Sequence, residues 1–242
     1  MSSYILLVFE GQVTEKVIWD NLSKFYFKDL NRNTVISAYC NEIYAFYHSI
    51  KDDSDIDVFV LLKNMEINKE NLSNISRDEI SEIFLFFDYD AHSSAANDEK
   101  IKHMLGRFNN ETEDGKLYIS YPMVESIKHL KKSVDFSAVT VPCKKNIKYK
   151  GFVAKNNDGR LNDLSSLKEI DWNYIIGQHC FKLNYLINNN FELPVITYTQ
   201  LEILEKQIEK HVNPKEEVSV LSAFPIFALD YYGVEYIKVR LS

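Results

Sequence analysis

The amino-acid sequence predicts an α/β protein in which a mostly parallel, Rossmann-like sheet is flanked by helices and followed by a mainly α-helical subdomain. Up to residue 132, short apolar runs rich in β-branched and aromatic residues alternate with segments of helical periodicity. Continuous apolar runs of this kind are typical of parallel strands buried on both faces. Beyond residue 133, helical periodicity predominates. We therefore expect an α/β domain at residues 1–132 and a mainly helical subdomain at residues 133–242.

The predicted elements of the first domain alternate between strands and helices. The opening strand, Ser3–Phe9, ends at Glu10-Gly11, and Gly11 can adopt a positive φ in the turn that follows. Thr14 is a suitable N-cap for the next helix. This alternation favours a largely parallel sheet covered by helices. The other predicted strands are Thr34–Tyr39, the run from Ile83 to Phe87 and Lys116–Ser120. The predicted helices are Thr14 to about Lys28, Asn41–Ile50, Val58–Leu62, for which a strand is the alternative, and one capped by Asn97 or Asp98.

The second half of the chain has fewer strand-like segments. Pro122 suits the first turn of a helix that carries Glu125. Gly233 is a typical helix stop. Further helices are predicted at Trp172–Asn188, Thr199–Val212 and Val218–Tyr232, with a short final strand at Tyr236–Leu241.

Composition narrows the class of protein. With 242 residues, 45% of them hydrophobic, the chain can bury a sizeable core. No apolar run approaches the ~20 residues of a membrane span, and the N-terminus lacks the pattern of a secretory signal. Three widely spaced cysteines are typical of buried thiols in a reducing compartment, so we expect a cytoplasmic protein that does not bind a membrane. The net charge of −7 argues against broad adhesion to nucleic acid but is compatible with a local basic groove.

Acidic residues follow two of the predicted strands. Asp88 and Asp90 come directly after the run that ends at Phe87, and Glu10 follows the opening strand. Ligands of open α/β sheets collect at the carboxyl ends of the strands. Carboxylates gathered there would repel one another unless a cation neutralised them, and Mg²⁺ or Mn²⁺ prefers such oxygen ligands. The spelling D-x-D alone has little specificity, because Asp53–Asp55 and Asp55–Asp57 repeat it in a polar connection.

Two further acids and a group of lysines are weaker candidates. Glu15 stands in the first turn of the predicted helix, where it also suits the helix dipole, and Glu125 could equally be a surface residue. His92 follows the aspartates closely, although a lone loop histidine is usually just exposed. The lysines could form a solvated face or neutralise phosphates without reading bases. They are Lys128, Lys131, Lys132, Lys144, Lys145 and Lys148, with Lys150 beside them.

The order strand–Glu10-Gly11–helix followed by strand–Asp88-Tyr89-Asp90 resembles the Toprim domain of topoisomerases, primases and nucleases. With Glu15 and the P-x-x-E at Pro122–Glu125, it is most similar to the stand-alone OLD-type and RloB-like Toprim nucleases of abortive infection and phage defence. The resemblance covers about residues 1–130. It implies that Glu10 is a metal ligand or general acid/base, that Asp88 and Asp90 hold Mg²⁺ or Mn²⁺, and that Glu15 and Glu125 assist.

Two hypotheses follow from this resemblance. The first is a metal-dependent endonuclease that cleaves DNA or RNA, including tRNA, as a toxin-like effector of anti-phage defence. The second is a regulatory or binding subunit that works through a partner ATPase, which would be a separate chain because this sequence contains no P-loop. A haloacid dehalogenase-type phosphatase also uses D-x-D, but there the pair follows the first strand. The oligomeric state stays open.

Overall fold

The computed structural model describes residues 4–28, 34–53 and 55–242, and Ser3 of the predicted opening strand lies outside them. The chain divides into two compact units. The first comprises the residues up to Phe87 together with Asn97–Leu117, and the second comprises Asp88–Ala96 together with Tyr118–Ser242. The predicted division between residues 132 and 133 falls within the second unit.

A five-stranded sheet in the order β2-β1-β3-β5-β4 makes the chain an α/β protein, as the sequence predicts. β1 runs parallel to both β2 and β3, while the short β4 runs antiparallel to β5. The register between β1 and β2 extends from Tyr4 opposite Thr34 to Phe9 opposite Tyr39. The strands are β1 Tyr4–Phe9, β2 Thr34–Tyr39, β3 Ile80–Asp88, β4 Asn109–Asn110 and β5 Gly115–Ser120.

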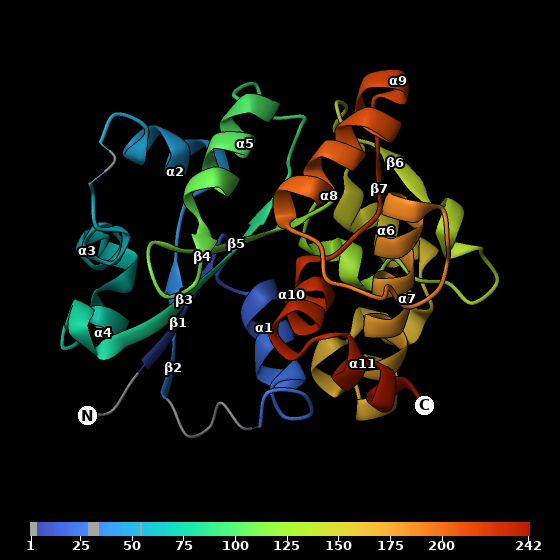
Figure 1. Cartoon of the computed structure of the whole chain (residues 1–242), viewed down its shortest axis with the longest axis horizontal. Helices are drawn as coiled ribbons and strands as arrows, with labels where there is room; N and C mark the ends of the chain where they lie inside the picture. Colours follow the sequence, from blue (N-terminus) through green and yellow to red (C-terminus); the bar gives the residue numbers. More distant parts are fainter. Residues whose placement is uncertain (1–3, 29–33, 54) are drawn as a thin grey trace. The chain divides into compact units, whose positions relative to one another are not determined.

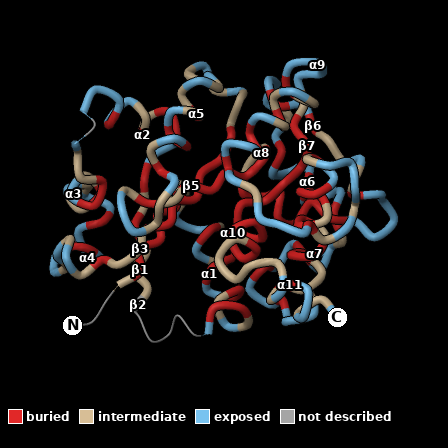
Figure 2. The backbone as a smooth tube through the Cα atoms, viewed as in Figure 1, coloured by how far each residue is buried: buried red, intermediate tan, exposed pale blue. Residues whose placement is uncertain are grey.

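The central strands form because their apolar runs are covered on both faces. Ile5 to Phe9 and Ile83 to Phe87 are all almost completely buried, and Figure 2 draws both strands mainly in red. Phe46 of α2 stacks on Phe87 of β3 and on Phe108. Burial on both faces removes any need for alternation with polar residues, which is why these runs were recognisable in the sequence.

Helices of the first unit cover both faces of its strands. The chain crosses from β1 to β2 in one direction along the sheet, and the connections after β2 run in the other direction. Because such connections are right-handed, α1 lies on one face and α2 and α5 lie on the other (Figure 1). Asn97 caps α5 as predicted, its side chain accepting from Glu99 N and Lys100 N. The helices are α1 Thr14–Leu22, α2 Ile43–Ile50, α3 Val58–Asn64, α4 Lys69–Leu72 and α5 Asp98–Arg107.

The predicted first helix was wrong in two details. Thr14 is the first helical residue rather than the N-cap, which is Val13 and makes no side-chain capping bond. The helix also ends at Leu22 instead of near Lys28. Trp19 and Phe27 pack together with their ring centroids 5.1 Å apart, so tertiary packing holds the turn after Leu22 in place of further helix.

The second unit is mainly helical beyond residue 148, whereas the sequence predicted a mainly helical subdomain from residue 133. Its core surrounds α7, which contacts α8, α10 and α11. Residues Ala223–Leu229 of α10 are all buried, and a two-stranded antiparallel ribbon pairs β6 with β7. The elements are β6 Thr140–Pro142, α6 Tyr149–Asn156, α7 Glu169–Asn188, α8 Gln200–Gln207, α9 Asn213–Lys215, β7 Glu217–Ser219, α10 Ala223–Tyr232 and α11 Val234–Leu241, with 3₁₀ helix Val124–Lys128 and π-helix Ile208–Val212.

Three predictions in this half were wrong. Tyr236–Leu241 is helical, because α11 packs its Leu241 side chain against Gly177 of α7. The segment from Val218 begins as strand β7 and becomes helical only at Ala223. Pro122 forms a cis peptide with Tyr121 and precedes a 3₁₀ helix instead of opening an α-helix. Gly233 does end α10, with a φ of 77°. None of the described helices combines the length and apolar character needed to cross a membrane.

Candidate functional site

The strand order reverses between β1 and β3, the place where open α/β sheets bind their ligands. The chain leaves β1 at Glu10, and Asp88 is the last residue of β3. Glu10 N donates to the carbonyl of Phe86, so the turn after β1 is tied to β3 two residues before Asp88. Of the predicted site residues, Glu10 therefore follows one strand that flanks the reversal, and Asp88 ends the other.

Glu10 and Glu15 belong to the first unit and have different surroundings. Glu10 is partly exposed, whereas Glu15 is buried and accepts a 2.9 Å hydrogen bond from Gly11 N. A Cβ on Gly11 would lie 2.8 Å from Glu15 Oε2, so a larger residue here would require the Glu15 carboxylate to shift. Gly11 does not have the positive φ that was expected. Burial raises the pKa of the Cys40 thiol to about 12, with Glu10 acting in the same direction. Glu15 thus holds the turn that carries Glu10.

Asp88 and Asp90 belong to the second unit, where backbone bonds fix the turn between them. Tyr89 N donates to Ser120 O, and Asp90 N donates to Pro122 O. Asp88 is buried, while Asp90 has a φ of 39° in the left-handed region. This conformation, unusual for a non-glycine residue, interrupts the strand alternation that would direct residues two apart to one side of the sheet. His92 Nδ1 lies 2.6 Å from Asp90 Oδ1 and pairs with it when the imidazole is protonated.

Glu125 is a buried carboxylate on the 3₁₀ helix Val124–Lys128. Lys150 Nζ lies 3.7 Å from its Oε1, at the edge of ion-pair distance. Burial raises the pKa of the Tyr149 phenol well above its usual value, and the charges of Glu125 and then Asp88 raise it further. Because both carboxylates act on one phenol, the structure brings Asp88 and Glu125 into the same electrostatic environment.

A cavity of about 360 Å³ opens beside Asp90, and we call it the lysine cavity. Lys145, Lys148 and Lys150 line it together with Asp90 and His92, and all three lysines are exposed. Lys148 has a φ of 52°, so the chain turns sharply there before α6 begins. Positive charge concentrated in a concave surface attracts anions such as phosphates.

The lysines predicted to bind nucleic acid differ in their exposure and in their position relative to the lysine cavity. Lys131, Lys132 and Lys144 are exposed but do not line the lysine cavity. Lys128, expected on a surface, is buried instead, because the 3₁₀ helix directs it inward next to Glu125. Burial lowers the pKa of Lys128, with Glu125 opposing and Lys150 reinforcing the shift. Lys128 therefore offsets the charge of Glu125 and is not placed to contact a long anion.

Sequence reasoning missed the pair of His129 and Tyr149. His129 Nδ1 and Tyr149 Oη form a buried 2.9 Å hydrogen bond. Burial, reinforced by Lys182, lowers the pKa of His129 to about 4, so its imidazole is neutral near pH 7. The two residues are separated by a segment with no recognisable motif, and only the presence of a histidine in the lysine-rich stretch could have drawn attention to it.

The carboxylates are chemically suited to a hard divalent cation. Asp88 and Glu125 are buried, and two desolvated carboxylates near one another favour a cation partner. Within the described residues, no group of three or more His, Cys, Asp or Glu side chains is already arranged around a common point for a metal ion. A metal at this site would thus draw some of its ligands from water or substrate, as Mg²⁺ commonly does.

No protein-family model matches the sequence, and neither a curated protein nor a solved structure matches it significantly.

Proposed function

We propose that this protein is a cytoplasmic, Mg²⁺- or Mn²⁺-dependent nuclease of the Toprim type, which cleaves phosphodiester bonds of DNA or RNA. The observation that carries the proposal is the position of Asp90 in the wall of the lysine cavity, two residues after buried Asp88. Acids that suit a divalent cation and lysines that suit phosphates thus meet in one place. Phosphodiester cleavage needs this combination.

In this proposal the carboxylates and lysines have separate roles. Asp88 and Asp90 hold the metal, with Glu125 as a further ligand. The Toprim resemblance implies a role as metal ligand or general acid/base for Glu10, whose turn Glu15 fixes. The bound metal would lower the pKa of a water and polarise the phosphate. Lys145, Lys148 and Lys150 neutralise and orient the phosphates of the strand. The role as a toxin-like effector of phage defence rests on the Toprim resemblance.

The experiment that tests the proposal compares two D-x-D pairs. We expect Asp88→Asn/Asp90→Asn to abolish Mn²⁺ binding measured by calorimetry and to lower Mn²⁺-dependent cleavage of plasmid DNA or tRNA by roughly 100-fold or more, since removing even a group that supports a metal ligand costs 10- to 100-fold. Asp53→Asn/Asp55→Asn is the matched control, because these exposed acids repeat the spacing elsewhere. Undiminished cleavage by the first variant would remove the aspartates from the mechanism.

The same assay separates this proposal from the hypothesis of a partner-activated subunit. Metal binding that depends on Asp88 and Asp90, without turnover of any nucleic acid by the isolated chain, would favour a subunit that a partner such as an ATPase activates. Turnover by the isolated chain would make such a partner unnecessary for catalysis.

A further inference from the structure

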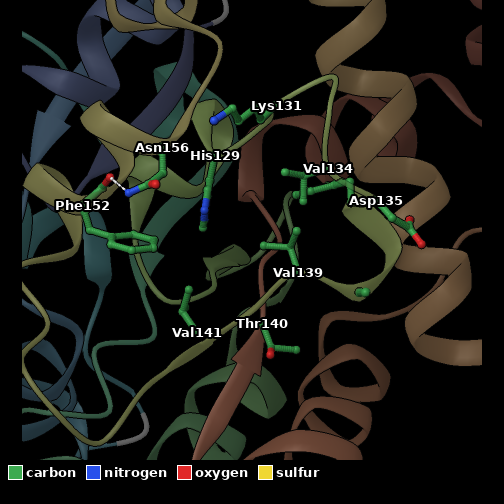
Figure 3. A pocket seen from close by; sticks show the side chains of 11 residues that line it. His129, Lys131, Val134, Asp135, Val139, Thr140, Val141, Phe152 and Asn156 are labelled. Carbon is green, nitrogen blue, oxygen red and sulfur yellow. Dashed lines mark hydrogen bonds between the residues drawn. The ribbon is translucent and has the colours of Figure 1, made fainter.

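A second cavity, of about 380 Å³, lies within the same unit and is lined by His129, and we call it the aromatic cavity (Figure 3). His129, Phe152, Val134 and Val139 form much of its wall, with Lys131 and Asn156 at polar positions. Its volume is in the range of small-molecule binding sites, which are mostly apolar with a few directed polar groups. Nothing in the proposed chemistry uses this cavity.

His129 offers the aromatic cavity a directed hydrogen-bond donor. Tyr149 keeps its proton because its pKa is raised, and His129 is neutral because its pKa is lowered to about 4. Tyr149 Oη therefore donates to His129 Nδ1, which leaves the ring proton on Nε2. His129 is 8% exposed, and among the described residues its Nε2 has no hydrogen-bond partner. Figure 3 shows the ring extending into the cavity.

Phe152 gives the cavity an accessible aromatic ring. It is 41% exposed, so one part of the ring is open to a ligand. Its ring stands at 88° to that of His129, with the centroids 5.6 Å apart. Two rings at right angles form a corner in which a flat heteroaromatic ring can stack on one wall while its edge accepts a hydrogen bond from the other.

The aromatic cavity and the lysine cavity both take residues from helix α6. α6 contributes Tyr149, Lys150 and Gly151 to the lysine cavity, and Phe152 and Asn156 to the aromatic cavity. A ligand that carries an anionic part and a flat polar ring on one linker could place one part in each cavity. A nucleotide has this construction.

We propose that the aromatic cavity binds one unpaired nucleobase of a strand whose phosphate lies in the lysine cavity. This inference rests on the proposed function and narrows its substrate to nucleic acid with unpaired nucleotides. Base stacking on an exposed aromatic ring is tolerant of sequence, so Phe152 would select for an accessible base and not for a particular one.

The test uses binding of small ligands to the full chain, which requires no cleavage. We expect AMP to bind about tenfold more tightly than ribose 5-phosphate in a calorimetric titration, the size of effect that one base stack produces. Phe152→Leu, which keeps apolar bulk but loses the ring, should remove this advantage and leave the affinity for ribose 5-phosphate unchanged. Phe152→Trp should preserve it. Circular dichroism would establish that the variants are folded.

The outcomes for the cavity and for the nuclease are independent. Three results would overturn the proposal that the aromatic cavity binds a base, even if the protein cleaves nucleic acid. They are equal affinity for AMP and ribose 5-phosphate, weak binding of both, and an AMP affinity that Phe152→Leu does not change. A base preference that depends on Phe152 would support the cavity even if no cleavage were found. Lys145→Ala/Lys148→Ala should weaken both ligands equally, because both carry the phosphate.

Discussion

Lys182 is a charged side chain that the second unit buries completely. Its Nζ donates to the carbonyls of Phe136, Ser137 and Val139 at 2.7–2.9 Å, which uses all three donors of an ammonium group. These carbonyls belong to the turn that forms one wall of the aromatic cavity. Burial lowers the pKa of Lys182 to about 7, and Asp135 opposes the shift. Lys182 therefore fixes the short 3₁₀ helix Phe136–Ala138 and the residue that follows it.

We expect Lys182→Met to lower the free energy of unfolding by about 2–4 kcal/mol, because it removes three hydrogen bonds from the interior. Phe136 O and Val139 O keep the bonds that Val139 N and Val220 N donate, whereas Ser137 O loses the donor that Lys182 supplies. Lys210→Met is the matched control. Lys210 Nζ also donates to backbone carbonyls, those of Leu186 and Ile187, but at a partly exposed position where water can replace it. Guanidinium unfolding of both variants checks the prediction, and equal losses would argue against a special role for the buried turn.

At the scale of elements, the sequence predicted those parts whose apolar pattern is local. β1, β2, β3, α5 and α7 all appear where they were expected, since their strands are continuous apolar runs or their helices have clear caps and periodicity. α11 was mistaken for a strand because Ile237, Val239 and Leu241 alternate, and only packing of Leu241 on Gly177 reveals the helix. Tertiary contacts decided its structure against the local pattern.

Some residues of the candidate site could be predicted from local sequence, and others could be recognised only in the structure. Asp88 and Asp90 could be found because a buried strand precedes them, and Glu125 because it follows Pro122 at a familiar spacing. The pairing of His129 with Tyr149 could not be found, because neither the 3₁₀ helix nor α6 has a distinctive pattern and only the fold brings them together. A sequence shows which residues can do chemistry, but distant partners require the structure.

The lysines of the loop before α6 should make the affinity for nucleic acid depend on salt concentration. If the lysine cavity holds phosphates, Lys145→Ala/Lys148→Ala should reduce the slope of log affinity against log salt concentration by about 1.4 for single-stranded nucleic acid, or about 0.7 per lost phosphate contact. Lys155→Ala/Lys215→Ala removes the same charge at exposed positions outside the cavity. Fluorescence anisotropy at several salt concentrations measures both slopes. The same reduction in both double variants would mean that net charge and not the cavity attracts the strand.

At the scale of the whole molecule, the second unit combines segments that are distant in the sequence. Ser126 Oγ donates to Leu221 O, Ala223 N donates to Ser120 Oγ, and Tyr118 Oη donates to Asp230 Oδ2. These bonds attach the end of β5 and the 3₁₀ helix to α10 and the chain before it. The turn that carries Asp88 and Asp90 joins this assembly through Ser120 and Pro122. Unfolding of the C-terminal helices should therefore also disrupt the candidate site.

Buried histidines make the free energy of unfolding depend on pH. Burial lowers the pKa of His129 to about 4 and that of His179 to about 3, with Lys182 acting in the same direction on both. In the unfolded chain each has a pKa near 6.5, so between these values the unfolded state binds more protons than the folded state. Their contribution is fully present above pH 6.5 and is lost as the pH falls towards 4.

We therefore expect the free energy of unfolding to decrease below pH 6.5 with a slope of up to about 1.4 kcal/mol per pH unit for each such histidine. His129→Asn should make the slope shallower, since the variant has one less group that gains a proton only on unfolding. His48→Asn, at an exposed position on α2, should leave the slope unchanged. Urea unfolding between pH 7 and 4.5 provides the measurement. A free energy independent of pH across this range would mean that the folded protein accepts these protons, and that the interior around His129 is more open to water than its 8% exposure implies.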